Sequence, residues 1–293
     1  MWRFTAGALL VLLPWFGGLA SGEICVKFKG CRNFFYKETP PVGFTGVPIC
    51  QRYKGNYHFA TMYDRQHRTA RYSAYLLTPA DGNRPSNSWM YEPQLASNGG
   101  DREMKEFPPN SIPQDVIRSQ AVLEDYTGGN YTKGHLAPSQ HMGTSDDRAA
   151  TFTLTNIVPQ TNFSNNGPWS DLEKRVLQRF RQYCTGKMYV ITGTIPYKPV
   201  RLLKGRVSIP EYIWSAYCCP SFKSKLPNDT SFFPTYAAVG RNDPDSGEEI
   251  VEKDPSPYAV KEMSLANLEN ILWQNLKKKK LNLFKGQCKQ GKP

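Results

Sequence analysis

Three residues in the middle of the chain have side chains that could do chemistry, namely His135, Asn165 and Glu173. A histidine can exchange a proton near neutral pH, although a lone histidine beside apolar residues is more often structural. Asn165 could instead be a simple helix-start signal, because asparagine caps helices well. Glu173 could be an ordinary surface acid. Each residue alone is therefore a weak indication of function.

The position of Glu173 favours a role for it. It lies four residues after Trp169 and three before Val176, so it borders the apolar stripe of a predicted helix. A carboxylate there needs a partner or a metal ion. Asn165 precedes it by eight residues (173 − 165 = 8), which on one helix is about 80° of rotation and about 12 Å of rise. The two would share a side of the helix without both ligating one ion directly, so one would bind the metal and the other act through water.

The elements that must position these residues form a mixed pattern. The clearest is a helix over about 167–183, where apolar residues recur at intervals of three and four: Trp169, Leu172, Val176, Phe180 and Tyr183. A second helix is predicted over 264–280, with Ser264 as its N-cap and lysines at its end.

Predicted strands and helices are mixed along the chain, without the regular alternation of βαβ units. We expect a hairpin from residues 57–63 and 71–77, a loop over 80–111, a helix over 114–124 and strands over 152–158, 188–195, 212–218 and 232–239. The fold class that follows is α+β, with a central antiparallel sheet flanked by helices.

The N-terminus has the pattern of a secretory signal. Arg3 precedes a short apolar run over 6–13, and small residues follow it up to Gly22. We therefore expect a signal peptide over 1–22, an irregular cysteine-bearing arm over 23–56 and one large domain over 57–293. No later segment is long and apolar enough for a membrane helix, so we expect a secreted protein without a membrane anchor.

Cysteine content and charge agree with an extracellular protein that binds polyanions. None of the seven cysteines has the CxxC spacing of a zinc site, so disulfides are expected, with at least one cysteine left over: Cys25, Cys31, Cys50, Cys184, Cys218, Cys219 and Cys288. The net charge is +12, which favours nucleic acid, anionic lipid or sulfated sugar without separating them. Sequons occur at Asn130, Asn162 and Asn228, and the last lies in the most suitable surroundings.

Two motifs carry a resemblance to a known family. The first is Lys133-Gly134-His135, and the second runs through Thr155-Asn156-Ile157-Val158-Pro159-Gln160 to Asn165 and Glu173. The spacings of 30 (165 − 135) and 8 residues match the pattern of the DNA/RNA non-specific endonucleases of the ββα-metal superfamily. The resemblance covers about residues 57–275 and is closest to the secreted vertebrate endonuclease domain-containing branch, as segments 59–64 and 72–75 also suggest.

The resemblance implies roles for the site residues and a ββα-metal motif in the fold. His135 would act as the general base, Asn165 would hold Mg²⁺ (with Mn²⁺ as a substitute), and Glu173 would position the waters of the ion. Lys133 would place positive charge near the phosphate. Arg84, which precedes Trp89, is our candidate for a second family arginine, although it could be an ordinary surface residue. The substrate would be DNA or RNA, cut without sequence specificity to leave 5′-phosphate and 3′-hydroxyl ends.

The chain departs from the family motif at one point. Thr132-Lys133 replaces the family's Asp-Arg, and lysine lacks the bidentate fork of arginine. This change, with the sequons beside both motifs, supports an alternative in which the fold is catalytically weak or inactive and binds extracellular polyanions or a protein partner. A zinc pair between His135 and His141 is disfavoured, because Pro138 interrupts helical spacing and no acid lies between them.

Overall fold

The computed structural model describes residues 25–86, 88–223, 226, 233–276 and 281–288. The expected signal peptide over 1–22, the sequon at Asn228 and the lysines at 277–280 lie outside these residues. No helix in the described part of the chain is long and apolar enough to cross a membrane.

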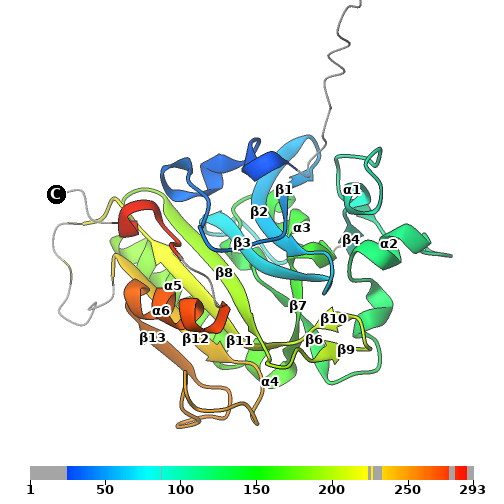
Figure 1. The fold of residues 1–293 in the computed structure, drawn as a ribbon. Coiled ribbons are helices and arrows are strands. Elements are labelled where there is room, and N and C mark those ends of the chain that lie inside the picture. Colours follow the sequence, from blue (N-terminus) through cyan, green and yellow to red (C-terminus); the bar gives the residue numbers. More distant parts are fainter. Residues whose placement is uncertain (1–24, 87, 224–225, 227–232, 277–280, 289–293) are drawn as a thin grey trace, which may run out of the picture.

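A seven-stranded antiparallel sheet forms the centre of the molecule (Figure 1). Its order is β1-β2-β3-β8-β11-β12-β13, and every neighbouring pair is antiparallel. The strands are β1 (Val47–Tyr53), β2 (Asn56–Asp64), β3 (Thr69–Leu77), β8 (Met188–Pro196), β11 (Pro210–Cys218), β12 (Thr235–Arg241) and β13 (Val260–Met263). The predicted fold class is confirmed. The expectation of an irregular arm up to residue 56 is wrong at its end, because β1 pairs with β2 as an edge strand.

Helices cover both faces of this sheet. Side chains of a strand alternate between its faces, so each face carries apolar residues that a helix can bury. In β11, Tyr212, Trp214 and Ala216 belong to one apolar core, which also contains the buried side of α6 (Leu265–Leu276). The intervening Ile213 and Tyr217 belong to a second core on the other face, with the buried side of α5 (Pro168–Tyr183). Ser264 caps α6 as predicted, since its hydroxyl accepts from Asn267 N at 3.2 Å.

A separate two-stranded hairpin lies beside α5 in sequence and space. It consists of β6 (Tyr131–His135) and β7 (Ile157–Thr161), and it is followed by α4 (Asn162–Asn165) and then α5. This is a ββα unit. The strand expected over 152–158 begins only at Ile157, because a turn and a 3₁₀ helix occupy the preceding residues.

The helix expected to run through Asn165 and Glu173 is interrupted. Asn165 ends α4, and α5 begins at Pro168, with Gly167 between them in a non-helical conformation (φ −115°, ψ −124°). A Cβ on Gly167 would lie 2.4 Å from the Phe163 carbonyl oxygen, so glycine permits this break. The rotation and rise calculated for one continuous helix therefore do not apply.

Short elements complete the fold. The helix expected over 114–124 is only α2 (Gln114–Ser119), followed by a 3₁₀ turn. The others are α1 (Pro93–Ala96), α3 (Ser145–Ala150), β4 (Met90–Tyr91), β5 (Lys105–Glu106), β9 (Leu202–Leu203), β10 (Val207–Ser208) and 3₁₀ helices at Val26–Phe28, Arg32–Phe34, Tyr36–Glu38, Leu123–Tyr126, Ser139–His141, Leu154–Asn156 and Lys285–Cys288.

Disulfides connect the chain across the sheet, as the cysteine content predicted. The pairs are Cys31–Cys50, Cys184–Cys219 and Cys218–Cys288. The seventh cysteine, Cys25, has its sulfur 2.7 Å from that of Cys50.

Candidate functional site

His135 is the last residue of β6 and lies opposite Ile157 of β7. The residue before it, Gly134, lies against Gln160, so that a Cβ there would be 2.3 Å from Gln160 Oε1 and 2.6 Å from Gln160 Cβ. Only glycine fits at this distance. The close approach of the two strands thus fixes the end of β6, where the histidine projects.

The His135 ring is neutral and has an unused nitrogen. Its centroid lies 5.7 Å from that of Trp89 and 5.2 Å, edge-on, from that of Phe152. Burial lowers the pKa of His135 to about 3, the charge of Arg84 lowers it further, and a hydrogen bond to the Lys133 backbone opposes both. Among the described residues, the buried Nε2 has no hydrogen-bond partner. A neutral imidazole with a free acceptor nitrogen has the form that a general base requires.

Asn156 fixes the backbone that follows His135. Its carbonyl accepts from Leu136 N at 3.0 Å, and its side-chain amide exchanges two 3.0 Å hydrogen bonds with the backbone of Ala137. Ser73 of β3 donates to the same amide oxygen at 2.9 Å, which ties this turn to the central sheet. We did not assign Asn156 a role from sequence. Its signal there was a polar residue inside an otherwise apolar run.

Asn165 lies against the start of the same hairpin. Its Nδ2 donates to Thr132 Oγ1 at 3.0 Å, and Thr132 in turn donates to the Gln160 carbonyl at 2.8 Å. Thr132, which replaces the family aspartate, therefore orients the Asn165 amide. In the described part of the molecule, Asn165 Oδ1 accepts no hydrogen bond, so this oxygen is available to a ligand.

Glu173 extends from α5 into a poorly solvated position. Burial raises the pKa of its carboxyl to about 8, while the Trp169 side chain and the charges of Arg84 and Lys174 partly lower it. The charge of Arg84 thus lowers the pKa of both His135 and Glu173.

His141 supports the helix rather than a zinc ion. Its Nδ1 lies 2.9 Å from the Tyr75 hydroxyl and its Nε2 3.0 Å from the Glu173 carbonyl oxygen. Burial lowers the pKa of His141 to about 4, and the bond to the Glu173 backbone opposes this. Both ring nitrogens of His141 thus lie within hydrogen-bond distance of protein groups, which leaves neither nitrogen free to bind zinc.

Two cations lie at the edge of the site. The Arg84 guanidinium carbon is 5.1 Å from the Phe152 ring centroid, and Lys133 Nζ is 5.2 Å from that of Trp89. Burial lowers the pKa of Lys133. The aromatic residues Trp89 and Phe152 therefore hold both the histidine and the cations, a role that the spacing of the motifs did not reveal.

The donor set fits Mg²⁺. Asn165 offers an amide oxygen and Glu173 a carboxylate, the hard oxygen ligands that this ion prefers. The raised pKa of Glu173 indicates a carboxylate that lacks enough compensating positive charge, which a divalent cation would supply.

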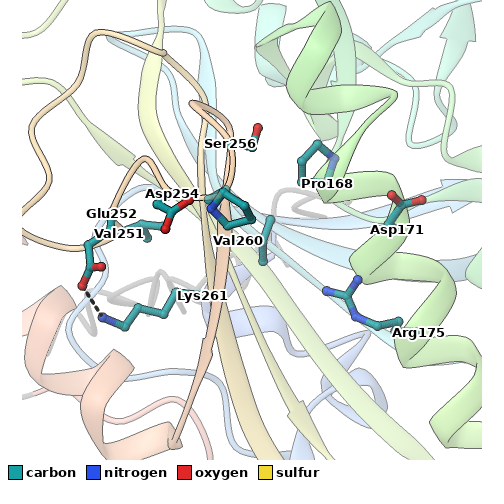
Figure 2. A pocket seen from close by; sticks show the side chains of 11 residues that line it. Pro168, Asp171, Arg175, Val251, Glu252, Asp254, Ser256, Val260 and Lys261 are labelled. Atoms are coloured by element: carbon teal, nitrogen blue, oxygen red, sulfur yellow. Dashed lines mark ion pairs between the residues drawn. The ribbon is translucent and has the colours of Figure 1, made fainter.

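A groove on another side of α5 is separate from these residues (Figure 2). One side of the groove is formed by Pro168, Asp171 and Arg175 of α5. The other side is formed by the segment over 251–261, in which Lys261 Nζ lies 3.9 Å from Glu252 Oε1. None of the predicted site residues lines this groove. On α5, Glu173 is rotated by about 200° from Asp171, which explains the separation.

Comparison with known proteins identifies the family. Residues 41–271 match the family model described as DNA/RNA non-specific endonuclease. The chain is 33% identical over 223 residues to the human "Endonuclease domain-containing 1 protein", covering 73% of this chain and 43% of the human protein. It is 30% identical over 160 residues to a "Nuclease" of Nostoc sp., covering 53% and 50% respectively. The chain thus spans less than half the length of the human relative.

A solved structure with a similar arrangement is that of an EndoG/EndoGI complex. Its TM-score is 0.48 at 16% identity, over 78% of this chain and 84% of that one. With the family model covering more than half of the sequence, the chain belongs to the DNA/RNA non-specific endonuclease family.

Proposed function

We propose that this protein is a secreted, metal-dependent endonuclease that hydrolyses phosphodiester bonds in DNA or RNA without sequence specificity. One observation carries the proposal: a neutral His135 at the end of β6 in the ββα unit has an unpartnered Nε2, and the charge of Arg84 acts on both this histidine and the acid of the following helix. Secretion is supported by the apolar N-terminal segment and by the three disulfides.

The roles of the side chains follow from their protonation and position. His135 Nε2 would accept a proton from the attacking water, because burial keeps the ring neutral. Asn165 Oδ1 would hold the metal ion, and the Glu173 carboxylate would position its waters. When bound, Mg²⁺ would supply positive charge to the phosphate and to the departing 3′ oxygen. Arg84 and Lys133 would bind the flanking phosphates of the strand.

The expected lack of sequence specificity follows from the same chemistry. The cationic and oxygen groups of the site suit phosphate oxygens, which are the same at every nucleotide. Products would carry 5′-phosphate and 3′-hydroxyl ends. The replacement of Asp-Arg by Thr132-Lys133 is expected to lower the rate without abolishing it, since Thr132 still orients Asn165.

The test is cleavage of supercoiled plasmid and of RNA by the purified protein, in Mg²⁺ and in EDTA. His135→Ala should abolish cleavage, while His67→Ala should retain it, because His67 lies on the distant β2–β3 turn paired with Asp64. Both substrates remaining intact in Mg²⁺ and in Mn²⁺ would refute the proposed activity. It would instead favour the alternative of a nuclease fold that binds polyanions or a partner.

A further inference from the structure

An exposed aromatic ring, that of Phe163, and a half-buried one, that of Tyr258, form a pair beside Asn165. Phe163 of α4 is 71% exposed, the highest value for a large apolar side chain among the described residues. Its ring stacks on that of Tyr258, with centroids 5.9 Å apart and an interplanar angle of 25°. Isolated apolar residues are common on surfaces, but this one stacks on a second ring and lies two residues before Asn165.

The backbone holds Phe163 in this outward position. The next residue, Ser164, is buried and accepts a hydrogen bond from Gln160 Nε2 at 3.1 Å, which fixes the short helix against β7. Because Ser164 faces inward, Phe163 faces solvent. Phe163 is thus presented by the same four-residue helix that carries Asn165.

The ring pair borders a hollow that includes a neighbour of Asn165. Phe163, Tyr258 and Tyr131 line it, together with Thr132, the residue that accepts the hydrogen bond of Asn165. Thr132 and His135 are three residues apart on β6, which is about 10 Å of strand. A nucleotide next to the scissile phosphate could therefore place its base in this hollow.

The charges around the hollow do not exclude a nucleic-acid strand. Its acidic side chain is Asp243, whose carboxylate is paired with Arg201 at 3.1 Å and also accepts from the Tyr197 hydroxyl. Asn242 binds the Asp243 segment to β7, since it accepts from Thr161 N at 3.0 Å and donates to the Pro159 carbonyl at 3.0 Å. The Asp243 segment is thus bound to β7, and the carboxylate in the hollow is paired with a cation.

We propose that Phe163 and Tyr258 form a stacking subsite for an unpaired base that neighbours the scissile phosphate. This proposal rests on the nuclease function proposed above. Stacking uses the π-face that every base possesses, so it binds single strands without reading sequence. A base within a duplex is already stacked on both faces, so it has no free face for this contact. Single-stranded nucleic acid and the unpaired loops of RNA are therefore the preferred substrate class.

The test is binding of a fluorescent single-stranded oligonucleotide, followed by anisotropy in Mg²⁺. The protein is the full chain carrying His135→Ala to prevent cleavage. It is made in a host that adds no N-glycans, because Asn130 and Asn162, which both line the hollow, belong to sequons. Adding Phe163→Ala should weaken binding about 5- to 100-fold, whereas Phe163→Trp should preserve it. An oligonucleotide of the same length with abasic sites should bind both proteins equally. Trp273→Ala, which removes another exposed aromatic ring on α6, is the matched control and should bind as tightly as the parent.

The outcomes separate the two proposals. If the His135→Ala protein binds neither oligonucleotide, the proposed nuclease function itself is contradicted. If it binds both equally and Phe163→Ala changes nothing, the stacking subsite alone is wrong. If Phe163→Ala instead abolishes a concentration-dependent dimer seen by analytical ultracentrifugation, the ring pair is a contact with a second copy of the chain and not a base subsite.

Discussion

The two buried histidines outside the catalytic position should affect stability in opposite directions as pH falls. His141 is 2% exposed, and its ring nitrogens face the Tyr75 hydroxyl and the Glu173 carbonyl. Burial lowers the pKa of His141 to about 4. Between its unfolded pKa of about 6.5 and this value, the unfolded chain binds a proton that the folded chain excludes. Acid therefore removes stability through His141.

The size of this effect follows from the two pKa values. At pH 7.5 both states are neutral at His141 and the difference is close to zero. At pH 5 the unfolded histidine is protonated and the folded one is not, which costs about 2 kcal/mol of unfolding free energy. Replacing His141 with glutamine keeps hydrogen-bonding groups in the pocket but removes the titration. The stability of His141→Gln relative to wild type should rise by about 2 kcal/mol between pH 7.5 and pH 5.

His58 provides the matched contrast. Burial acts to lower its pKa, but the hydrogen bond to Asp147 at 2.6 Å and the one to the Tyr53 carbonyl raise it overall. A raised histidine pKa contributes stability that is complete below about pH 6.5 and is lost as pH rises through the folded value. His58→Gln should thus be more damaging at pH 5 than at pH 7.5.

The assay is urea unfolding of the three proteins in EDTA, followed by circular dichroism at several pH values. Equal pH dependence in wild type and His141→Gln would refute the assignment of a neutral, buried His141. The same sign of change for both variants would contradict the opposed environments of the two histidines.

Three further changes test the site. Gly134→Ala would clash with Gln160, so it should lower the unfolding free energy by about 1–3 kcal/mol and reduce cleavage. Gly129→Ala is the control and should do neither, because its Cβ would have no neighbour closer than 3.9 Å. Chemical denaturation measures the stability of both variants, and plasmid cleavage measures their activity. Glu173→Gln should stabilise the metal-free protein at pH 8, because a carboxyl with a raised pKa destabilises the fold as pH rises above 4.5. The same change should lower Mg²⁺-dependent cleavage. A lower thermal stability of the metal-free Glu173→Gln protein would contradict the assignment of Glu173 as a buried acid. Arg84→Ala should lower kcat/KM for plasmid about 10-fold, because a charged contact with phosphate is lost. An unchanged kcat/KM would show that Arg84 is an ordinary surface residue.

Local sequence pattern was sufficient for the main elements. The apolar stripe of α5, the β2–β3 hairpin and the strands β8, β11 and β12 lie close to where residue periodicity predicted them. The apolar stripe of α5 has a helical period, and the central strands, which are buried on both faces, are continuous apolar runs. The spacing between His135, Asn165 and Glu173 likewise identified the family before any fold was known.

Apolar periodicity failed at two places, one polar residue and one glycine. The run over 152–158 resembles a strand, but Asn156 is needed to hold the backbone after His135, so the chain turns there and the strand starts later. Gly167 divides the expected helix because its backbone is non-helical and a Cβ there would meet the Phe163 carbonyl, four residues earlier. The contacts of Asn156 with Ala137 and Ser73 are not visible in a local window of sequence.

The sequence by itself determined which residue types are available, the periodicity of the main elements and the family spacing. Only the tertiary structure decided the protonation and pairing on which the chemistry depends. Trp89 and Phe152 come from separate segments to bury His135, and Arg84 acts on both His135 and Glu173 across the fold. A pKa depends on solvation and on charges within a few ångströms, and those neighbours are assembled only when distant parts of the chain pack together.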